Sequence, residues 1–98
     1  MMGTKLSSIN RKLTINDFKE EEAKWYFRCN DWEICFWQTQ GACGKMTIQA
    51  RYVEGGKSYL KDEKILKWKP KVSKYEIKER NRSMWYWINK FSKYCNHG

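Results

Sequence analysis

The sequence has no apolar run near the roughly 20 residues that a membrane-spanning helix requires, and this absence excludes an integral membrane protein. It has one histidine, His97, next to the last residue. Because chain ends fray, His97 is poorly placed to act as a general base. A phosphate-binding loop is also missing, since Gly55-Gly56-Lys57-Ser58 lacks the spacing of a P-loop. We therefore expect no catalytic residues, no cofactor and no enzyme activity, with a small metal-free ribonuclease as the enzymatic alternative.

Tightly spaced cysteine pairs are absent as well. Five residues separate Cys29 from Cys35 and seven separate Cys35 from Cys43, and Cys95 lies far from all three. Structural zinc sites usually contain close C-x-x-C pairs, so we expect no metal site. Residues 1–13 contain no apolar stretch of the length found in export signals. The sequence thus predicts a cytoplasmic protein whose cysteines are reduced thiols.

Acidic residues are scarce in the second half of the chain. Residues 55–98 carry twelve Lys and Arg against four Asp and Glu, a balance of +8, whereas residues 1–54 carry eight against seven, or +1. This uneven positive charge indicates an acidic partner, such as nucleic acid or an acidic protein surface. The 98 residues suffice for a single small domain, residues 1–98, in which we expect residues 1–13 to form a flexible basic arm.

The most specific structural pattern lies in residues 24–38, which predict a β-hairpin. Asn30-Asp31 suits a two-residue turn, because both residue types tolerate left-handed geometry. Folding there places the apolar pairs on one face: Cys29–Trp32, Phe27–Ile34 and Trp25–Phe36. The opposite face then carries Arg28–Glu33, Tyr26–Cys35 and Lys24–Trp37. A slip of one residue would mix the two sets, so the pattern determines the register.

A second hairpin is expected around Gly55-Gly56. Residues 45–53 alternate as a strand whose inward side chains are Met46, Ile48, Ala50 and Tyr52. A three-residue loop would place Tyr59 opposite Arg51 on the outer face, and Leu60 opposite Ala50, whereas a two-residue loop would pair Tyr52 with Tyr59. Residues 61–69 then form a continuing strand or a basic connector that ends at Pro70.

Helices are expected at both ends of this β region. Residues 14–23 predict a short N-terminal helix with a thin apolar face. Residues 73–95 predict the main helix, because its apolar residues recur at helical spacing in Ile77, Met84, Ile88, Phe91 and Cys95. We therefore expect an α+β fold, in which the long C-terminal helix packs on one face of an antiparallel sheet of three to four strands.

Two sets of basic and aromatic residues are candidate binding surfaces. On the sheet face away from the helix we expect Lys24, Tyr26, Arg28, Trp37, Arg51 and Tyr59. On the solvent side of the helix we expect Tyr75, Lys78, Arg82, Tyr86, Lys90 and Lys93. Such residues suit single-stranded RNA or DNA, because bases stack on rings while cations contact phosphates. An N-terminal helix lying over the sheet would instead make Tyr26 and Trp37 part of a second small core.

These patterns favour a small basic nucleic-acid-binding module. One alternative is a compact inhibitor or adaptor, of the kind that phages and mobile elements direct against a host or defence protein or a nucleoprotein. Exposed Trp and Tyr support that alternative, since they are frequent interface hot spots. A metal-free ribonuclease toxin is the other alternative. We expect no membrane partner.

Overall fold

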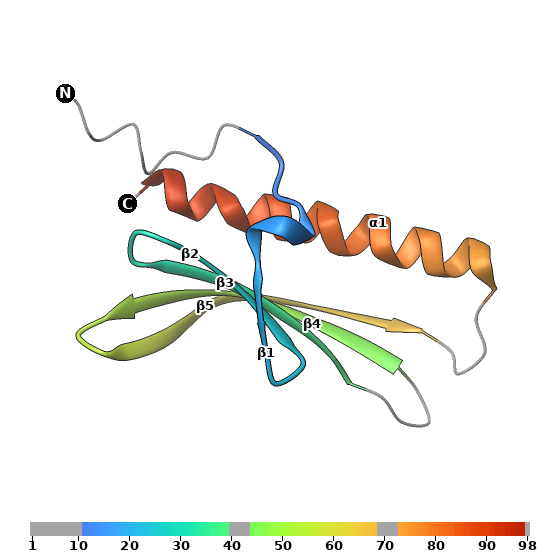
Figure 1. Ribbon diagram of the computed structural model, residues 1–98, viewed down its shortest axis with the longest axis horizontal. Coiled ribbons are helices and arrows are strands. Elements are labelled where there is room, and N and C mark those ends of the chain that lie inside the picture. Colours follow the sequence, from blue (N-terminus) through green and yellow to red (C-terminus); the bar gives the residue numbers. More distant parts are fainter. Residues whose placement is uncertain (1–10, 40–43, 69–72, 98) are drawn as a thin grey trace.

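A five-stranded antiparallel sheet and one long helix form two layers (Figure 1). The computed structural model describes residues 11–39, 44–68 and 73–97. The strands lie in sequence order: β1 (Lys19–Glu21), β2 (Lys24–Cys29), β3 (Trp32–Thr39), β4 (Gly44–Glu54) and β5 (Lys57–Trp68). Helix α1 (Lys74–Phe91) follows and continues into a 3-10 helix, η3 (Ser92–His97). The predicted α+β class is confirmed, but the sheet has more strands than the three or four expected.

The additional strand β1 replaces the predicted N-terminal helix. Only a single 3-10 turn, η2 (Ile15–Asp17), forms in this segment, and Lys19–Glu21 pairs with β2. Glu22 and Ala23 have φ values of +52° and +64°, so they make the tight left-handed turn between β1 and β2. A short helix is marginal without a broad apolar face to bury, and residues 14–23 lack one. Backbone pairing with β2 is therefore the more stable arrangement.

The predicted register of the β2–β3 hairpin is confirmed. All six expected pairs are present, from Lys24 opposite Trp37 to Cys29 opposite Trp32. Asn30 has a φ of +57°, the left-handed geometry that the turn requires. The apolar pairs therefore share the face that packs against α1, and the polar pairs share the other face.

The β4–β5 hairpin uses the two-residue turn, so the three-residue loop is wrong. Gly55 and Gly56 have φ values of +60° and +77°, and Tyr52 lies opposite Tyr59. A register shift next to Ala50 then places Arg51 opposite Leu60 and Ala50 opposite Asp62. Tyr59 consequently lies on the same side of the sheet as Tyr52 and not on the outer face with Arg51.

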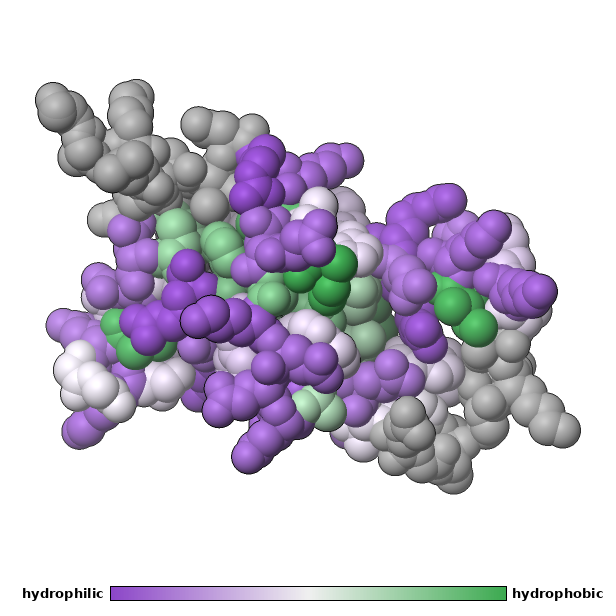
Figure 2. Space-filling model, in the orientation of Figure 1, coloured by the Kyte–Doolittle hydropathy of each residue, from purple (hydrophilic) through white to green (hydrophobic). Residues whose placement is uncertain are grey.

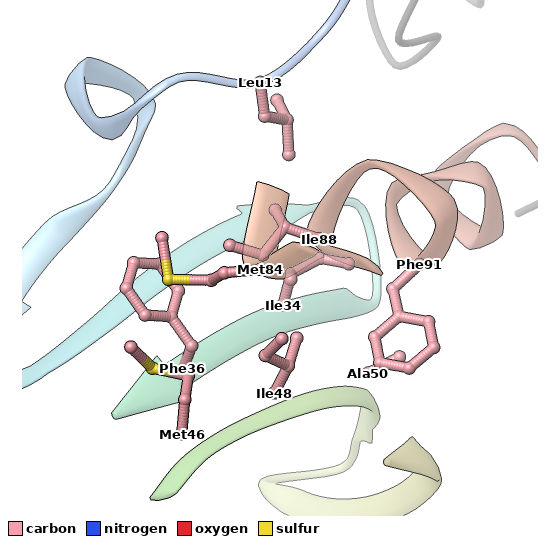
Figure 3. Close-up of a cluster of buried hydrophobic side chains, with 9 residues drawn as sticks. All are labelled: Leu13, Ile34, Phe36, Met46, Ile48, Ala50, Met84, Ile88 and Phe91. Atoms are coloured by element: carbon pink, nitrogen blue, oxygen red, sulfur yellow. The ribbon is translucent and has the colours of Figure 1, made fainter. Parts of the chain in front are cut away.

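The core lies between α1 and strands β3 and β4. Ile34, Ile48 and Ile88 are fully buried, and Phe91 is 2% exposed. Figure 3 shows these side chains meeting between the helix and the sheet, with Leu13 approaching from the N-terminal segment. Ser73 caps α1 by accepting a hydrogen bond from the Glu76 backbone N–H. This burial sets which side of the helix and of the sheet is left to solvent.

The N-terminal segment packs against the helix and not over the outer sheet face. Leu13 is 3% exposed, and its backbone N–H donates to Asn89 Oδ1 at 2.6 Å. Phe18 packs against Phe36 and Trp85 on the same inner side. Residues 1–10 of the expected flexible arm lie outside the described residues. Within the described part of the chain, no element covers Tyr26 and Trp37, so they are not a second core.

The turn at η2 contains a carboxylate whose ionisation contributes to stability. Asp17 accepts two hydrogen bonds from Arg11, at 2.6 and 2.9 Å, and one from the Thr14 backbone N–H at 2.8 Å. Arg11 is the main cause that lowers the pKa of Asp17 from 3.8 to about 2. A carboxylate with a lowered pKa stabilises the fold above its ordinary pKa, and this contribution is lost as the pH falls toward 2.

We therefore expect Asp17→Asn to lower the melting temperature at pH 6. This effect should shrink as the pH falls from 4 to 2, the range between the ordinary and the lowered pKa of Asp17. Thermal melts of the wild type and the variant across this range measure the difference. The same series with Asp31→Asn, which changes a carboxylate outside this turn, is the control. A difference that stays constant down to pH 2 would contradict the prediction.

Candidate nucleic-acid interface

The two predicted binding surfaces lie on opposite sides of the molecule. Helix α1 packs on the inner sheet face through Met84, Ile88 and Phe91. Lys24, Arg28 and their neighbours therefore point away from the helix, whereas the solvent side of α1 points away from the sheet. The structure does not bring these two sets together into one site.

The outer sheet face presents its rings only in part. Lys24 Nζ lies 4.9 Å from the ring centre of Trp37, and both Trp37 and Tyr26 are half-buried. Lys24 and Arg28 are exposed, while Arg51 is half-buried. Arg51 donates to Ser58 Oγ at 2.6 Å and to Gln49 Oε1 at 3.0 Å, so its guanidinium already has partners within the sheet.

Carboxylates interrupt the positive charge of this face. Glu33 lies opposite Arg28 on one side and opposite Arg51 on the other. Burial is the main cause that raises the pKa of Tyr26, and the charges of Cys35, Glu33, Glu21 and Glu22 raise it further. A phosphate next to Tyr26 would meet the negative charges of Glu33, Glu21 and Glu22.

The solvent side of α1 is more uniform, and we call it the helix ridge. It consists of six exposed residues, of which Lys93 lies in η3 and the other five in α1: Tyr75, Lys78, Arg82, Tyr86, Lys90 and Lys93. Tyr75 is 71% exposed and Tyr86 is 60% exposed, which makes them the most exposed aromatic residues of the described chain. One carboxylate, Glu79, adjoins the ridge and pairs with Arg82 at 3.2 Å. Asn89, which the helical pattern also places near this side, instead binds Leu13 and the Trp85 carbonyl.

Figure 2 shows how hydrophilic and hydrophobic residues are distributed on one side of the molecule. Hydrophilic residues cover most of this view, and the hydrophobic ones form separate patches. This side of the molecule therefore shows no broad apolar surface. A polar surface of this kind suits a hydrated, charged partner.

Between β5 and α1 lies a set of cation–ring contacts that the sequence pattern did not reveal. Lys64 and Lys90 place their Nζ atoms 4.8 and 4.7 Å from the ring centre of Trp87. The Arg80 guanidinium lies 4.5 Å from the ring centre of Trp68. Lys64 meets the helix only because β5 extends as a strand beside it. Of the two options for residues 61–69, a continuing strand or a basic connector, the strand is the one that forms as far as Trp68.

Tyr59 belongs to a different site from the other predicted residues. It is 52% exposed and lines an open groove with Trp32, Tyr52, Leu60, Lys61 and Tyr94. This groove is named the aromatic groove below. Its formation depends on the two-residue turn, which places Tyr59 beside Tyr52.

Two of the described cysteines, Cys35 and Cys95, are poorly activated thiols. Burial raises the pKa of Cys35 to about 11, and burial together with the neighbouring Cys29 raises the pKa of Cys95 to about 12. Cys43 and the side chain of His97 lie outside the described residues. In residues 11–39, 44–68 and 73–95, no group of three or more His, Cys, Asp or Glu side chains could hold a metal ion. The state of the thiols in the cell stays a prediction.

Comparisons with models of protein families, with curated proteins and with solved structures found no match for this chain. Among the described residues, no helix combines the length and apolar character needed to cross a membrane.

Proposed function

We propose that the protein binds single-stranded RNA or DNA through the helix ridge, without catalysing a reaction. The observation that carries this proposal is the combination of four exposed cations and the two most exposed tyrosines along one side of α1 and the start of η3. The outer sheet face has the same residue types, but its rings are half-buried and its cations alternate with carboxylates. Cytoplasmic action, where the cysteines would stay reduced, is part of the proposal.

The ridge is long enough to contact several nucleotides. Lys93 follows Tyr75 by 18 positions, which corresponds to about 27 Å at ~1.5 Å per residue. The four cations of the ridge would contact phosphates, while Tyr75 and Tyr86 would each stack on a base. Each phosphate contact releases counterions, so affinity should decrease steeply as salt increases.

A fluorescence-anisotropy titration with a labelled 20-nucleotide strand at several salt concentrations tests this function. We expect log K to fall with log salt at a slope near −3 if about four phosphates are contacted. Lys78→Ala/Arg82→Ala should make the slope shallower by about 1.4, since each contact with a single strand contributes about 0.7. The matched control Lys24→Ala/Arg28→Ala removes two exposed cations from the outer sheet face and should leave the slope nearly unchanged.

Ring substitutions test the stacking part of the same proposal. Tyr75→Ala and Tyr86→Ala should each weaken binding by ~1–3 kcal/mol without changing the slope, because a stacked ring releases no counterions. Trp37→Ala and Tyr26→Ala should have little effect, although they would be the sensitive positions if the strand lay on the sheet. No binding at micromolar protein in low salt would exclude the function, and a shortened strand would indicate the ribonuclease alternative.

One observation favours a protein-binding inhibitor as the second candidate. β5 is a 12-residue edge strand, and no described strand pairs with its outer edge. Such an edge can accept an extended segment of a partner protein, although its lysines oppose indiscriminate pairing. The ratio of absorbance at 260 nm to that at 280 nm, measured on protein purified without nuclease or high salt, separates the candidates. Retained nucleic acid supports the first, and a clean protein spectrum supports the second.

A further inference from the structure

The aromatic groove is a concave site that the function proposed above does not use. It has a volume of about 480 Å³ and is lined by Trp32, Tyr52, Tyr59, Leu60, Lys61 and Tyr94. Trp32 anchors it, stacking on Tyr94 at 4.8 Å between ring centres and meeting Tyr52 edge-on at 5.2 Å. Three strands and η3 therefore hold these rings in position, so the groove exists before any ligand arrives.

The rings of this groove differ in one respect from three of the other half-buried tryptophans. Trp37, Trp68 and Trp87 each have a Lys or Arg of the same chain over the ring. Within the described residues, no such cation lies over Trp32, Tyr52, Tyr59 or Tyr94. The ring faces attract cations through their electron density, so this cluster can accept a cation from another molecule.

Carboxylates next to the groove strengthen this preference. Asp62 accepts a hydrogen bond from the Tyr94 hydroxyl at 3.1 Å. The charge of Glu54 is the main cause that raises the pKa of Tyr52, with smaller contributions from burial and from Asp31. Burial, followed by Asp62, raises the pKa of Tyr94. Of the cations, Lys61 lies in the lining and Lys57 lies opposite Glu54. The negative charges of Glu54, Asp31 and Asp62 thus act on two tyrosines of the groove.

We propose that the aromatic groove binds an arginine side chain of a protein partner. A guanidinium is planar and weakly hydrated, so it can stack on Tyr59 or Trp32 while donating hydrogen bonds to Asp62. Lysine is a more strongly hydrated point charge, and a trimethylated ammonium cannot donate to a carboxylate. A nucleotide would bring its phosphate toward Asp31, Glu54 and Asp62, which disfavours it. This inference does not depend on nucleic-acid binding by the helix ridge.

Titration of the isotope-labelled full chain with the peptide N-acetyl-Gly-Arg-Gly-amide, followed by NMR, tests the proposal. We expect shifts of the Trp32 indole N–H and of the backbone amides of Tyr52, Tyr59 and Tyr94, with affinity on the order of millimolar for one side chain. The same peptide with citrulline, the uncharged analogue of arginine, should bind at least about tenfold more weakly, because the ring and carboxylate contacts both require the charge. The affinity of the corresponding lysine peptide should lie between those of the arginine and citrulline peptides.

Two exposed positions provide variants that do not disturb the core. Tyr59→Ala and Asp62→Asn should each weaken the binding of the arginine peptide about tenfold, since Tyr59→Ala removes a stacking surface and Asp62→Asn removes a charge. Tyr75→Ala, which removes an exposed ring from the helix ridge, should have no effect. Equal binding of the arginine and citrulline peptides would overturn the proposal, as would shifts confined to other residues. Tighter binding of a trimethyllysine peptide or of adenosine monophosphate would also overturn it.

Discussion

Replacing Phe91 with Ala is expected to lower the free energy of unfolding by about 3–5 kcal/mol, because it removes a buried aromatic ring from the centre of the core. Phe91 is 2% exposed and belongs to the core between α1 and the sheet. In Figure 3 its ring points from the helix toward Ala50. Ala50 is small and fully buried, so it cannot fill the space that the ring would leave. A cavity would remain and add to the lost burial of the ring.

Chemical denaturation of the wild type and the Phe91→Ala variant measures this difference. Tyr75→Ala removes an aromatic ring from the same helix at an exposed position, and it should change the stability by no more than about 0.5 kcal/mol. This pair separates the effect of core burial from that of helix propensity, because both variants introduce Ala into α1. A loss below about 1 kcal/mol for Phe91→Ala would show that the helix does not pack on the sheet through this ring.

Gly44→Ala is expected to destabilise the fold by about 1–3 kcal/mol, because it overfills the start of β4. Trp68, the last residue of β5, lies opposite Gly44, and its indole ring covers the glycine. An added Cβ would overlap the ring atoms Nε1 and Cε2 of Trp68. The ring would have to rotate away, and it would then lose its contact with Arg80.

A double-mutant cycle tests this explanation directly. In a Trp68→Ala background the added methyl group meets no ring. Gly44→Ala should therefore lower the free energy of unfolding far less than it does in the wild type. Denaturation curves of the four proteins provide the coupling energy. An equal cost in both backgrounds would contradict the steric explanation and would place the effect in the backbone of Gly44.

Local side-chain periodicity accounts for one part of this fold. The β2–β3 register follows from the sequence alone, since a two-residue turn at Asn30-Asp31 sorts the flanking residues into apolar and polar faces. The inward face of β4 and the buried stripe of α1 through Met84, Ile88 and Phe91 follow from it as well. These features depend on periodicity within one element or between neighbouring ones. The helix ridge follows from the same periodicity, because residues opposite a buried stripe face the solvent.

Features that depend on which elements meet were decided only by the tertiary structure. Residues 19–21 form a strand because β2 offers a free edge with which they pair. The thin helical pattern of residues 14–23 does not reveal that this pairing competes with helix formation. The register shift beside Ala50 and the turn at Gly55-Gly56 place Tyr59 next to Tyr52 and create the aromatic groove. A shift of one residue reverses the face of every side chain beyond it, and the sequence allowed both loop lengths.

The separation of the two predicted surfaces has the same cause. Basic and aromatic residues in β2 and in α1 look alike in the sequence, but the helix packs on the inner face of the sheet, so the two sets point in opposite directions. The contact of Lys64 with Trp87 likewise exists only because β5 lies beside α1. Side-chain periodicity states which face of an element is apolar. Only the packing of one element on another decides which polar faces end up side by side.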